Sequence, residues 1–171
     1  RSATDGTTTT TYVYDALGRR VRDITGSSRY SLYTQAGQVA YTSDARKRET
    51  MNYIYLAGSL VAASRLPTGS STPIVEYQHT DALGTPVVVT NASRAIVQKS
   101  EYEPYGNVIN RPKTDGIGFT GHVEDATTGL TYMQQRYYDP QVGRFLSIDA
   151  ISASQSTGAN FNRYWYADNR P

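Results

Sequence analysis

The chain has 171 residues, which suits one domain or a piece of a larger one, and its lack of cysteine excludes disulfides, thiolate nucleophiles and thiolate metal sites. The net charge is only +2, and the densest basic groups, at positions 19–22 and 46–48, have acidic neighbours, so we expect solvated faces and no nucleic-acid binding. No apolar run reaches the length needed to cross a bilayer, and membrane insertion is not expected.

Tyrosine dominates the aromatic residues. There are 15 tyrosines against three phenylalanines and one tryptophan, together with 14 glycines and seven prolines. A tyrosine side chain combines a large apolar body with a hydroxyl that tolerates water, which suits a half-buried sheet surface better than a dry core. Many short strands with frequent turns are therefore predicted. Because the chain starts at Arg1 with no apolar signal segment, we also expect a fragment of a longer protein.

Short β-prone segments recur along the first two-thirds of the chain, each followed by a turn that contains glycine. The segments are Thr9–Tyr14, Arg29–Tyr33, Asn52–Tyr55, Val75–His79 and Ser100–Tyr102, and the glycines stand at positions 18, 37, 58, 84 and 106. The intervals of 19, 21, 26 and 22 residues between these glycines each hold two ordinary strands and two turns, which is one hairpin. The pattern predicts an all-β meander of antiparallel β-hairpins.

The last third of the chain begins after a polar loop at positions 110–116. The segment Arg136–Asp149 predicts a further hairpin, in which Asp139-Pro140 starts the turn and Gly143 closes it. Near residues 160–166, apolar side chains at spacing i, i+3, i+4 favour one short helix. A strand with Tyr164 and Tyr166 on one face fits the same residues.

Several motifs occur in the order found in one protein family. They are Tyr12-Val-Tyr-Asp-Ala-Leu-Gly-Arg19, His79-Thr-Asp-Ala-Leu-Gly-Thr-Pro86, Tyr102-Glu-Pro-Tyr-Gly106, Phe119 to Leu130, Arg136 to Asp149 and Asn162 to Pro171. The first resembles the YD repeat, and the later ones resemble the stretch before the Rhs repeat-associated core and then the core itself. The resemblance covers essentially the whole chain. It identifies the chain as similar to the C-terminal shell segment of Rhs/YD-repeat proteins, which include the C components of Tc toxins.

The resemblance implies a spiral of antiparallel β-hairpins that wraps into a hollow shell. In bacteria such shells enclose a C-terminal toxin domain, and in animals teneurins use a related shell for cell-surface adhesion. Residues 1–109 are then a shell segment, 110–118 a loop, and 119–171 an inward-folded core segment, or plug, that stops before the final Asp-Pro-x-Gly. The implied partners are the remainder of the shell and an enclosed toxin domain, in a bacterial protein that is secreted or displayed at the cell surface.

The resemblance also implies an aspartic autoprotease that releases the toxin. Aspartic proteolysis needs two carboxylates that share a proton, and the family motifs assign these roles to Asp125 and Asp149, with Asp139 as a third candidate. Hydrogen bonding within a turn is the alternative for each aspartate. The chain departs from the family after Asp149, where alanine replaces proline, and before Asp125, where glutamate stands instead of the arginine of some members. The cleavage point implied by the family would follow Pro171.

No cofactor or metal site is predicted. The two histidines, His79 and His122, lie in turn-rich contexts and have no partner at metal-ligand spacing. An aromatic group formed by Tyr137, Tyr138, Tyr164 and Trp165 suits either stacking on sugars or packing of the plug against the shell wall. The alternatives to a shell fragment are therefore a module that binds glycans or a cell surface, and a fragment that self-associates through exposed hairpin edges.

Overall fold

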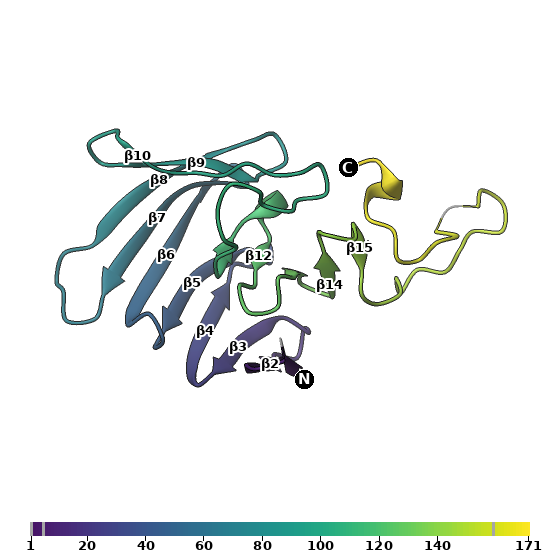
Figure 1. Cartoon of the computed structure of the whole chain (residues 1–171), viewed down its shortest axis with the longest axis horizontal. Helices are drawn as coiled ribbons and strands as arrows, with labels where there is room; N and C mark the ends of the chain where they lie inside the picture. The colour runs from purple at the N-terminus through teal and green to yellow at the C-terminus, as the bar shows by residue number, and fades with distance from the viewer. Residues whose placement is uncertain (1, 5, 159) are drawn as a thin grey trace.

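A computed structural model of the chain describes residues 2–4, 6–158 and 160–171. Within them, the first hundred residues form one antiparallel sheet whose strands follow chain order, and we call this sheet the wall. Its strands are β1 (Ser2–Thr4), β2 (Thr9–Tyr14), β3 (Arg20–Thr25), β4 (Ser27–Tyr33), β5 (Val39–Asp44), β6 (Glu49–Leu56), β7 (Ser59–Pro67), β8 (Ile74–Thr80), β9 (Pro86–Asn91) and β10 (Ile96–Lys99). Figure 1 shows these strands following an arc.

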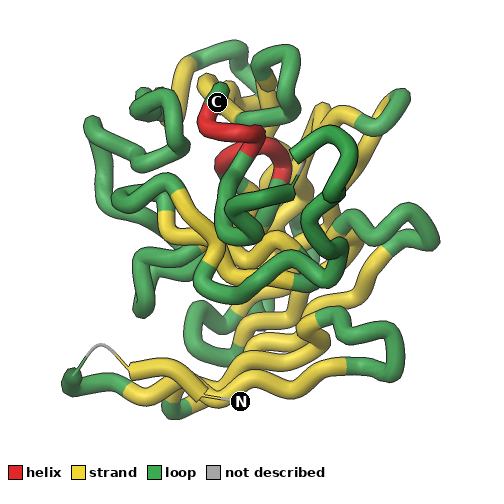
Figure 2. The backbone as a smooth tube through the Cα atoms, turned by 90° about the vertical axis from the view of Figure 1, so that its right-hand side faces the viewer, coloured by secondary structure: helices red, strands yellow, loops and turns green. Residues whose placement is uncertain are grey.

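A second antiparallel sheet, the inner sheet, lies on the concave side of this arc (Figure 1). Its strands in the described residues are β11 (Gly116–Ile117), β12 (Val123–Glu124), β13 (Thr131–Met133), β14 (Arg136–Asp139) and β15 (Arg144–Phe145). Two short 3-10 turns, η1 (Phe119–Gly121) and η2 (Ala167–Asn169), are far apart in the sequence but lie near each other, beside the C-terminus (Figure 2). No helix in the described part of the chain is long and apolar enough to span a membrane. The structure thus confirms the predicted arc of hairpins with an inward-folded C-terminal segment.

The repeated Asp-Ala-Leu-Gly segments form the same turn at two hairpins of the wall. In each, the aspartate Oδ1 accepts hydrogen bonds from the N–H groups two and four residues ahead, as Asp15 and Asp81 do at 2.8–2.9 Å. The glycine that closes the turn has a φ of 76° at Gly18 and 86° at Gly84, a conformation that other residues adopt only with strain. The Asp-Ala-Leu-Gly motif therefore reverses the direction of the chain between two consecutive strands of the wall.

The two faces of the wall differ in burial. In β2, Tyr12 is 5% exposed on the concave face, whereas Val13 on the convex face is 42% exposed. The buried residues of neighbouring strands include charged side chains, among them Asp23, Arg29 and Asp44. Apolar side chains are buried in the wall as well, among them Leu60 and Val89. A separate apolar cluster forms where Phe119 of η1 packs with Tyr138 and Phe145 of the inner sheet. Attachment of the inner sheet to the wall thus depends on polar as well as apolar contacts.

The prediction of a short helix near residues 160–166 is wrong. The chain there forms bends and turns, and Trp165 makes an isolated β-bridge with Arg144. Phe161 is 81% exposed, so the expected apolar face has no surface to pack on, and a short helix without such packing is unstable. The N–H of Tyr164 instead bonds the Asn162 side chain at 3.1 Å.

Candidate functional site

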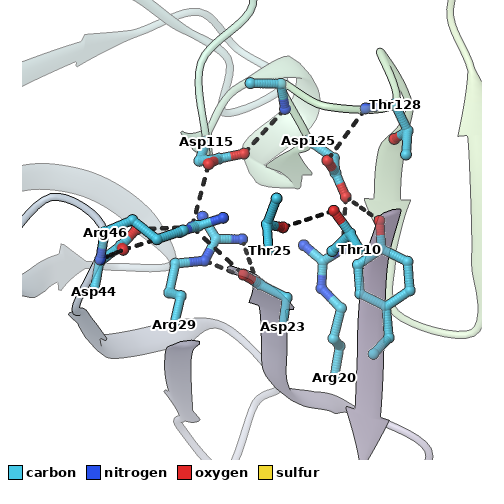
Figure 3. Close-up of polar contacts among 12 residues, drawn as sticks. Thr10, Arg20, Asp23, Thr25, Arg29, Asp44, Arg46, Asp115, Asp125 and Thr128 are labelled. Carbon is cyan, nitrogen blue, oxygen red and sulfur yellow. Dashed lines mark hydrogen bonds and ion pairs between the residues drawn. The ribbon is translucent and has the colours of Figure 1, made fainter. Parts of the chain in front are cut away.

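Asp125 lies at the centre of a buried contact between the inner sheet and the wall (Figure 3). Its Oδ2 accepts a hydrogen bond of 2.6 Å from the hydroxyl of Tyr12 and forms an ion pair of 3.1 Å with Nη1 of Arg20. The side chains of Arg20 and Asp125 are only 3% and 6% exposed. Since both charges are removed from water, loss of either would leave the other uncompensated in the interior.

The Arg20 guanidinium lies among three tyrosine rings. Its Cζ is 4.9 Å from the ring centroid of Tyr12 in the wall, and 4.7 and 5.9 Å from those of Tyr132 and Tyr137 in the inner sheet. The backbone N–H of Arg20 donates to the Tyr132 hydroxyl at 2.7 Å. Burial alone would lower the pKa of Arg20, but interactions with Tyr137 and Asp125 raise it well above its ordinary value. The guanidinium is therefore a permanently charged anchor that both sheets surround.

A tight turn after β12 presents the Asp125 carboxylate to the wall. Its Oδ1 accepts the N–H of Thr128 at 3.4 Å, and its carbonyl accepts the N–H of Gly129 at 2.9 Å. The N–H of Ala126 donates to Asp115 at 3.0 Å. One carboxylate oxygen of Asp125 is thus engaged in its own turn, which leaves Oδ2 directed at the wall.

A second ion-pair network ties the connection between the sheets to the wall (Figure 3). Arg46 contacts three carboxylates through its Nη2, with distances of 2.7 Å to Asp44, 3.2 Å to Asp115 and 3.4 Å to Asp23. Arg29 donates to Asp23 at 2.9 Å. Burial alone would raise the pKa of Asp44, but its hydrogen bonds and charge interaction with Arg46 lower it below the ordinary value. The ion pair between Arg46 and Asp115 thus attaches the segment before the inner sheet to the wall.

The tip of the β13–β14 hairpin touches two turns of the wall. Nε2 of Gln134 donates to the carbonyl of Gly37 at 2.8 Å, and Nε2 of Gln135 to the carbonyl of Leu17 at 3.4 Å. A Cβ at Gly37 would lie 2.8 Å from the Gln134 amide nitrogen, so glycine permits this approach. These turns therefore serve as docking points for the inner sheet as well as chain reversals.

The structure places Asp125 and Asp149 on opposite faces of the inner sheet. Asp149 Oδ2 is 2.9 Å from Nη2 of Arg136. Asp125 instead binds Arg20, whose Nη1 is also 3.4 Å from the Tyr137 hydroxyl. Arg136 and Tyr137 are consecutive in β14, so their side chains point to opposite faces. Each aspartate therefore has its own arginine, and among the described residues the two carboxylates share no hydrogen-bond or ion-pair partner.

Asp139 forms the turn expected of it. Its Oδ1 accepts the N–H groups of Gln141 at 2.9 Å and Val142 at 3.3 Å, and its carbonyl accepts the N–H of Gly143 at 2.8 Å. Gly143 has a φ of 70°, as the predicted turn requires.

The predicted aromatic group does not form one exposed platform. Tyr138 is fully buried, with its hydroxyl 2.8 Å from the carbonyl of Tyr105, and its ring packs against Phe119, Phe145 and Tyr166. The Tyr138 side chain is therefore part of the packed interior and is not available to stack on a sugar.

The anchor Arg20 was missed by the sequence reasoning, which placed it on a solvated face. This interpretation is wrong, since Arg20 is 2% exposed. Its partner Asp125 lies 105 residues further along the chain, whereas Asp23 is a nearer acid on the same strand. The charged residues near Arg20 in the sequence therefore did not indicate that it pairs with Asp125.

Glu124 is a second buried carboxyl group that the sequence reasoning did not single out as a site. It is 1% exposed, its Oε2 is 3.6 Å from Nη2 of Arg111, and its Oε1 has no hydrogen-bond partner among the described residues. Burial raises the pKa of Glu124, against the opposing effect of Arg111. In the described part of the chain, no group of three or more histidine or acidic side chains is placed to hold a metal ion.

A wall of hairpins reversed by Asp-x-x-Gly turns, with an inner sheet attached to its concave face through buried charge, defines a protein of the YD-shell class. The family model described as the teneurin YD-shell matches residues 1–171. The chain belongs to this family, and it is a structural segment of a YD shell.

Curated relatives carry several different names. The tRNA3(Ser)-specific nuclease WapA of Bacillus spizizenii is 28% identical over 94% of this chain, and the double-stranded DNA deaminase toxin A of Burkholderia cenocepacia is 27% identical over 96%. Teneurin-3 of the mouse is 27% identical over 95%. The chain spans only 7%, 13% and 6% of the lengths of these three proteins.

Solved structures show the same fold. The TcdB2–TccC3 crystal structure aligns with 99% of this chain at a TM-score of 0.68 and 21% identity, and the chain covers 9% of that protein. A Tc holotoxin pore of Photorhabdus luminescens that carries a TccC3 mutation aligns with 99% of this chain and gives a TM-score of 0.69 at 18% identity, again over 9% of its chain.

Proposed function

We propose that this chain forms part of the wall and the plug of a shell that encloses a C-terminal toxin domain. Relatives named as a tRNA nuclease and as a DNA deaminase toxin share this segment, although it makes up at most 13% of either. A segment common to proteins with different activities suits a container better than a catalyst. In this proposal residues 1–109 are wall, 119–171 are plug and 110–118 connect them, in a bacterial protein that acts outside the cell that makes it.

The observation that carries the proposal is the attachment of the inner sheet to the concave face. The ion pair between Arg20 and Asp125 and the hydrogen bond from Tyr12 are buried and join segments more than a hundred residues apart. A buried, geometrically specific charge pair favours one docked arrangement over others. A plug that closes a compartment needs this kind of fixed position.

Protection of an enclosed domain tests the proposal. The segment that corresponds to this chain in a complete YD-shell toxin is replaced by this chain, and the hybrid is digested with trypsin. We expect the C-terminal domain to survive in the parent and to be digested faster when Arg20→Ala loosens the plug. Arg22→Ala, on the convex face of the same strand, should leave protection unchanged. Equal digestion of the domain inside the shell and of the isolated domain would contradict enclosure.

Autoproteolysis by Asp125 and Asp149 remains a separate proposal. It requires the two carboxylates to lie close enough to share a proton. Asp125 is paired with Arg20, and Asp149 is paired with Arg136. The same hybrid, extended through the family's cleavage segment, is compared by intact mass with its Asp125→Asn and Asp149→Asn variants. Cleavage that each substitution abolishes supports the dyad, and cleavage that persists in both variants refutes it.

Self-association through sheet edges is a further proposal. Within the described residues, β1 and β10 are the first and last strands of the wall, and each has one side without a neighbouring strand in the sheet order. Light scattering of the chain should show mass that rises with concentration. A constant monomer mass would contradict it.

A further inference from the structure

The turn η1, which connects β11 and β12, packs on the wall several strands along the sheet from the Arg20 anchor. Its partner is the turn between β8 and β9. The N–H of Thr120 donates to the hydroxyl of Thr85 at 3.1 Å, and Thr85 is only 1% exposed. A Cβ at Gly121 would lie 3.7 Å from the carbonyl oxygen of Gly84, so the two turns are in close contact. We call this the η1 contact.

His122 follows η1 directly, and its half-buried side chain lies at the η1 contact. It shares the lining of two cavities with Leu83 of the β8–β9 turn. The backbone there forms a tight loop, in which the N–H of His122 donates to the carbonyl of Phe119 at 3.1 Å and its carbonyl accepts the N–H of Gly118 at 2.8 Å. Since η1 and His122 belong to one loop, separation of η1 from the wall would bring the imidazole into water.

None of the described residues that line these two cavities with His122 is acidic. The titratable and charged side chains among them are Tyr33 of β4, Tyr55 of β6, Tyr132 of β13, and Tyr166 and Arg170 of the C-terminal segment. The acid of the β8–β9 turn, Asp81, has its Oδ1 engaged by the N–H groups of Leu83 and Thr85. A protonated His122 would therefore lose hydration at the η1 contact without gaining an opposite charge.

The neutral form of His122 is the one that the docked state favours. Burial lowers the pKa of His122. The contribution of its neutral imidazole to stability is therefore complete above the unfolded value of about 6.5, and it is lost as pH falls toward the folded value. In the undocked loop, water solvates the imidazolium. Mild acid thus shifts the equilibrium toward the state in which η1 has left the wall.

We propose that protonation of His122 releases η1 from the β8–β9 turn, while Arg20 keeps the rest of the inner sheet on the wall. The Arg20 guanidinium contacts β13 and β14 through the rings of Tyr132 and Tyr137, and it stays charged in mild acid. The inner sheet is then loosened by acid at one end only. This inference concerns the docking of the inner sheet and holds whether or not the shell encloses a toxin.

Glu124, two residues further along the chain, responds to acid in the opposite direction. Burial raises the pKa of Glu124, so its protonation stabilises the folded chain. This effect is common to the parent and to a variant of His122. Comparison of the two at each pH therefore isolates the contribution of the imidazole.

Amide hydrogen exchange of the full chain at about pH 7.5 and about pH 5, corrected for the intrinsic exchange rates, measures the opening. The reporter is the N–H of Thr120, which bonds Thr85 across the η1 contact. We expect its protection factor to fall about threefold or more in acid, while amides of β6 and β7 keep theirs. The fall should follow the titration of the His122 ring, read by NMR from its Cε1–H resonance.

Three variants assign the response. His122→Gln should keep the protection seen at about pH 7.5 and lose the response to acid. His79→Gln, which replaces an exposed histidine of the wall, is the matched control and should respond as the parent does. Leu83→Asp supplies a carboxylate beside the imidazole, so its response should shrink or reverse.

The proposal is overturned if the protection of Thr120 does not change between the two pH values, or if amides of β6 and β7 lose protection equally, since that would be global unfolding. It is also overturned if the response persists unchanged in His122→Gln. Should His122→Gln already have lost protection at about pH 7.5, Leu83→Asp decides, and a response equal to that of the parent would refute the role of His122.

Discussion

Removal of the Arg20 guanidinium should separate the inner sheet from the wall. Arg20→Ala leaves the Asp125 carboxylate buried with a hydroxyl and a distant backbone N–H as its partners. Breaking one half of a buried ion pair costs about 3–5 kcal/mol, and the contacts of the guanidinium with three tyrosine rings are lost as well. A whole domain is stable by only about 5–15 kcal/mol. The expected loss is therefore a large share of the total.

Hydrogen exchange can locate this loss within the molecule. Since each 1.4 kcal/mol changes an equilibrium about tenfold, amides of β13 and β14 should exchange roughly two to four orders of magnitude faster in Arg20→Ala. Amides of β6 and β7, which pair with each other far from the anchor, should change much less. Local opening of this kind precedes global unfolding when one part of a structure depends on few buried contacts.

Arg22→Ala is the matched control. Arg22 stands on the same strand as Arg20 but bonds Ser28 at 2.8 Å and stacks on Tyr30 at the convex face. Loss of a partly exposed contact of this type costs about 0.5–1 kcal/mol. If Arg20→Ala proved no more destabilising than Arg22→Ala in urea unfolding, or if β6 and β13 gained exchange equally, the anchoring role of Arg20 would be refuted.

Two further substitutions test a buried carboxyl group of the inner sheet and a turn glycine that packs against Phe119. Burial raises the pKa of Glu124, so its contribution to stability is complete below the unfolded value of about 4.3 and is lost as pH rises through the folded pKa. The melting temperature of Glu124→Gln should therefore rise relative to that of the parent as pH increases from 4 to 8. A difference in melting temperature that does not change with pH would contradict this. Gly106→Ala would place a Cβ 2.3 Å from the Phe119 ring at a φ of 84°, for an expected loss of about 2–5 kcal/mol in urea unfolding. Gly58→Ala, with a similar φ and open space, should lose only about 1–2 kcal/mol, and equal losses for the two would argue against the packing explanation.

The local elements of the wall were predictable because their causes are local. The β-prone run Thr9–Tyr14 has the bounds of β2, and the glycines at positions 18 and 84 close the turns expected of them. Hairpin formation depends on side-chain alternation and on turn residues within about ten positions. The predicted turn from Asp139 to Gly143 was confirmed for the same reason.

The contacts between the two sheets were not predictable in this way. Arg20 has an acid three residues ahead on its own strand, yet it pairs with Asp125 in another sheet. The short helix near 160–166 was predicted from the spacing of its apolar residues, but Phe161 finds no surface to pack on. In both cases the deciding factor is which distant segment comes close, and periodicity along the chain carries no information about that.

The order of the strands has a consequence for synthesis. Every strand of the wall pairs with its neighbours in sequence, so each hairpin can form as soon as it leaves the ribosome. The contacts of Tyr12 with Asp125 and of Tyr14 with Tyr137 span 113 and 123 residues, and they must wait until the inner sheet has been translated. The arc can thus assemble hairpin by hairpin while its concave face stays open, and the inner sheet covers that face only after the wall strands have formed.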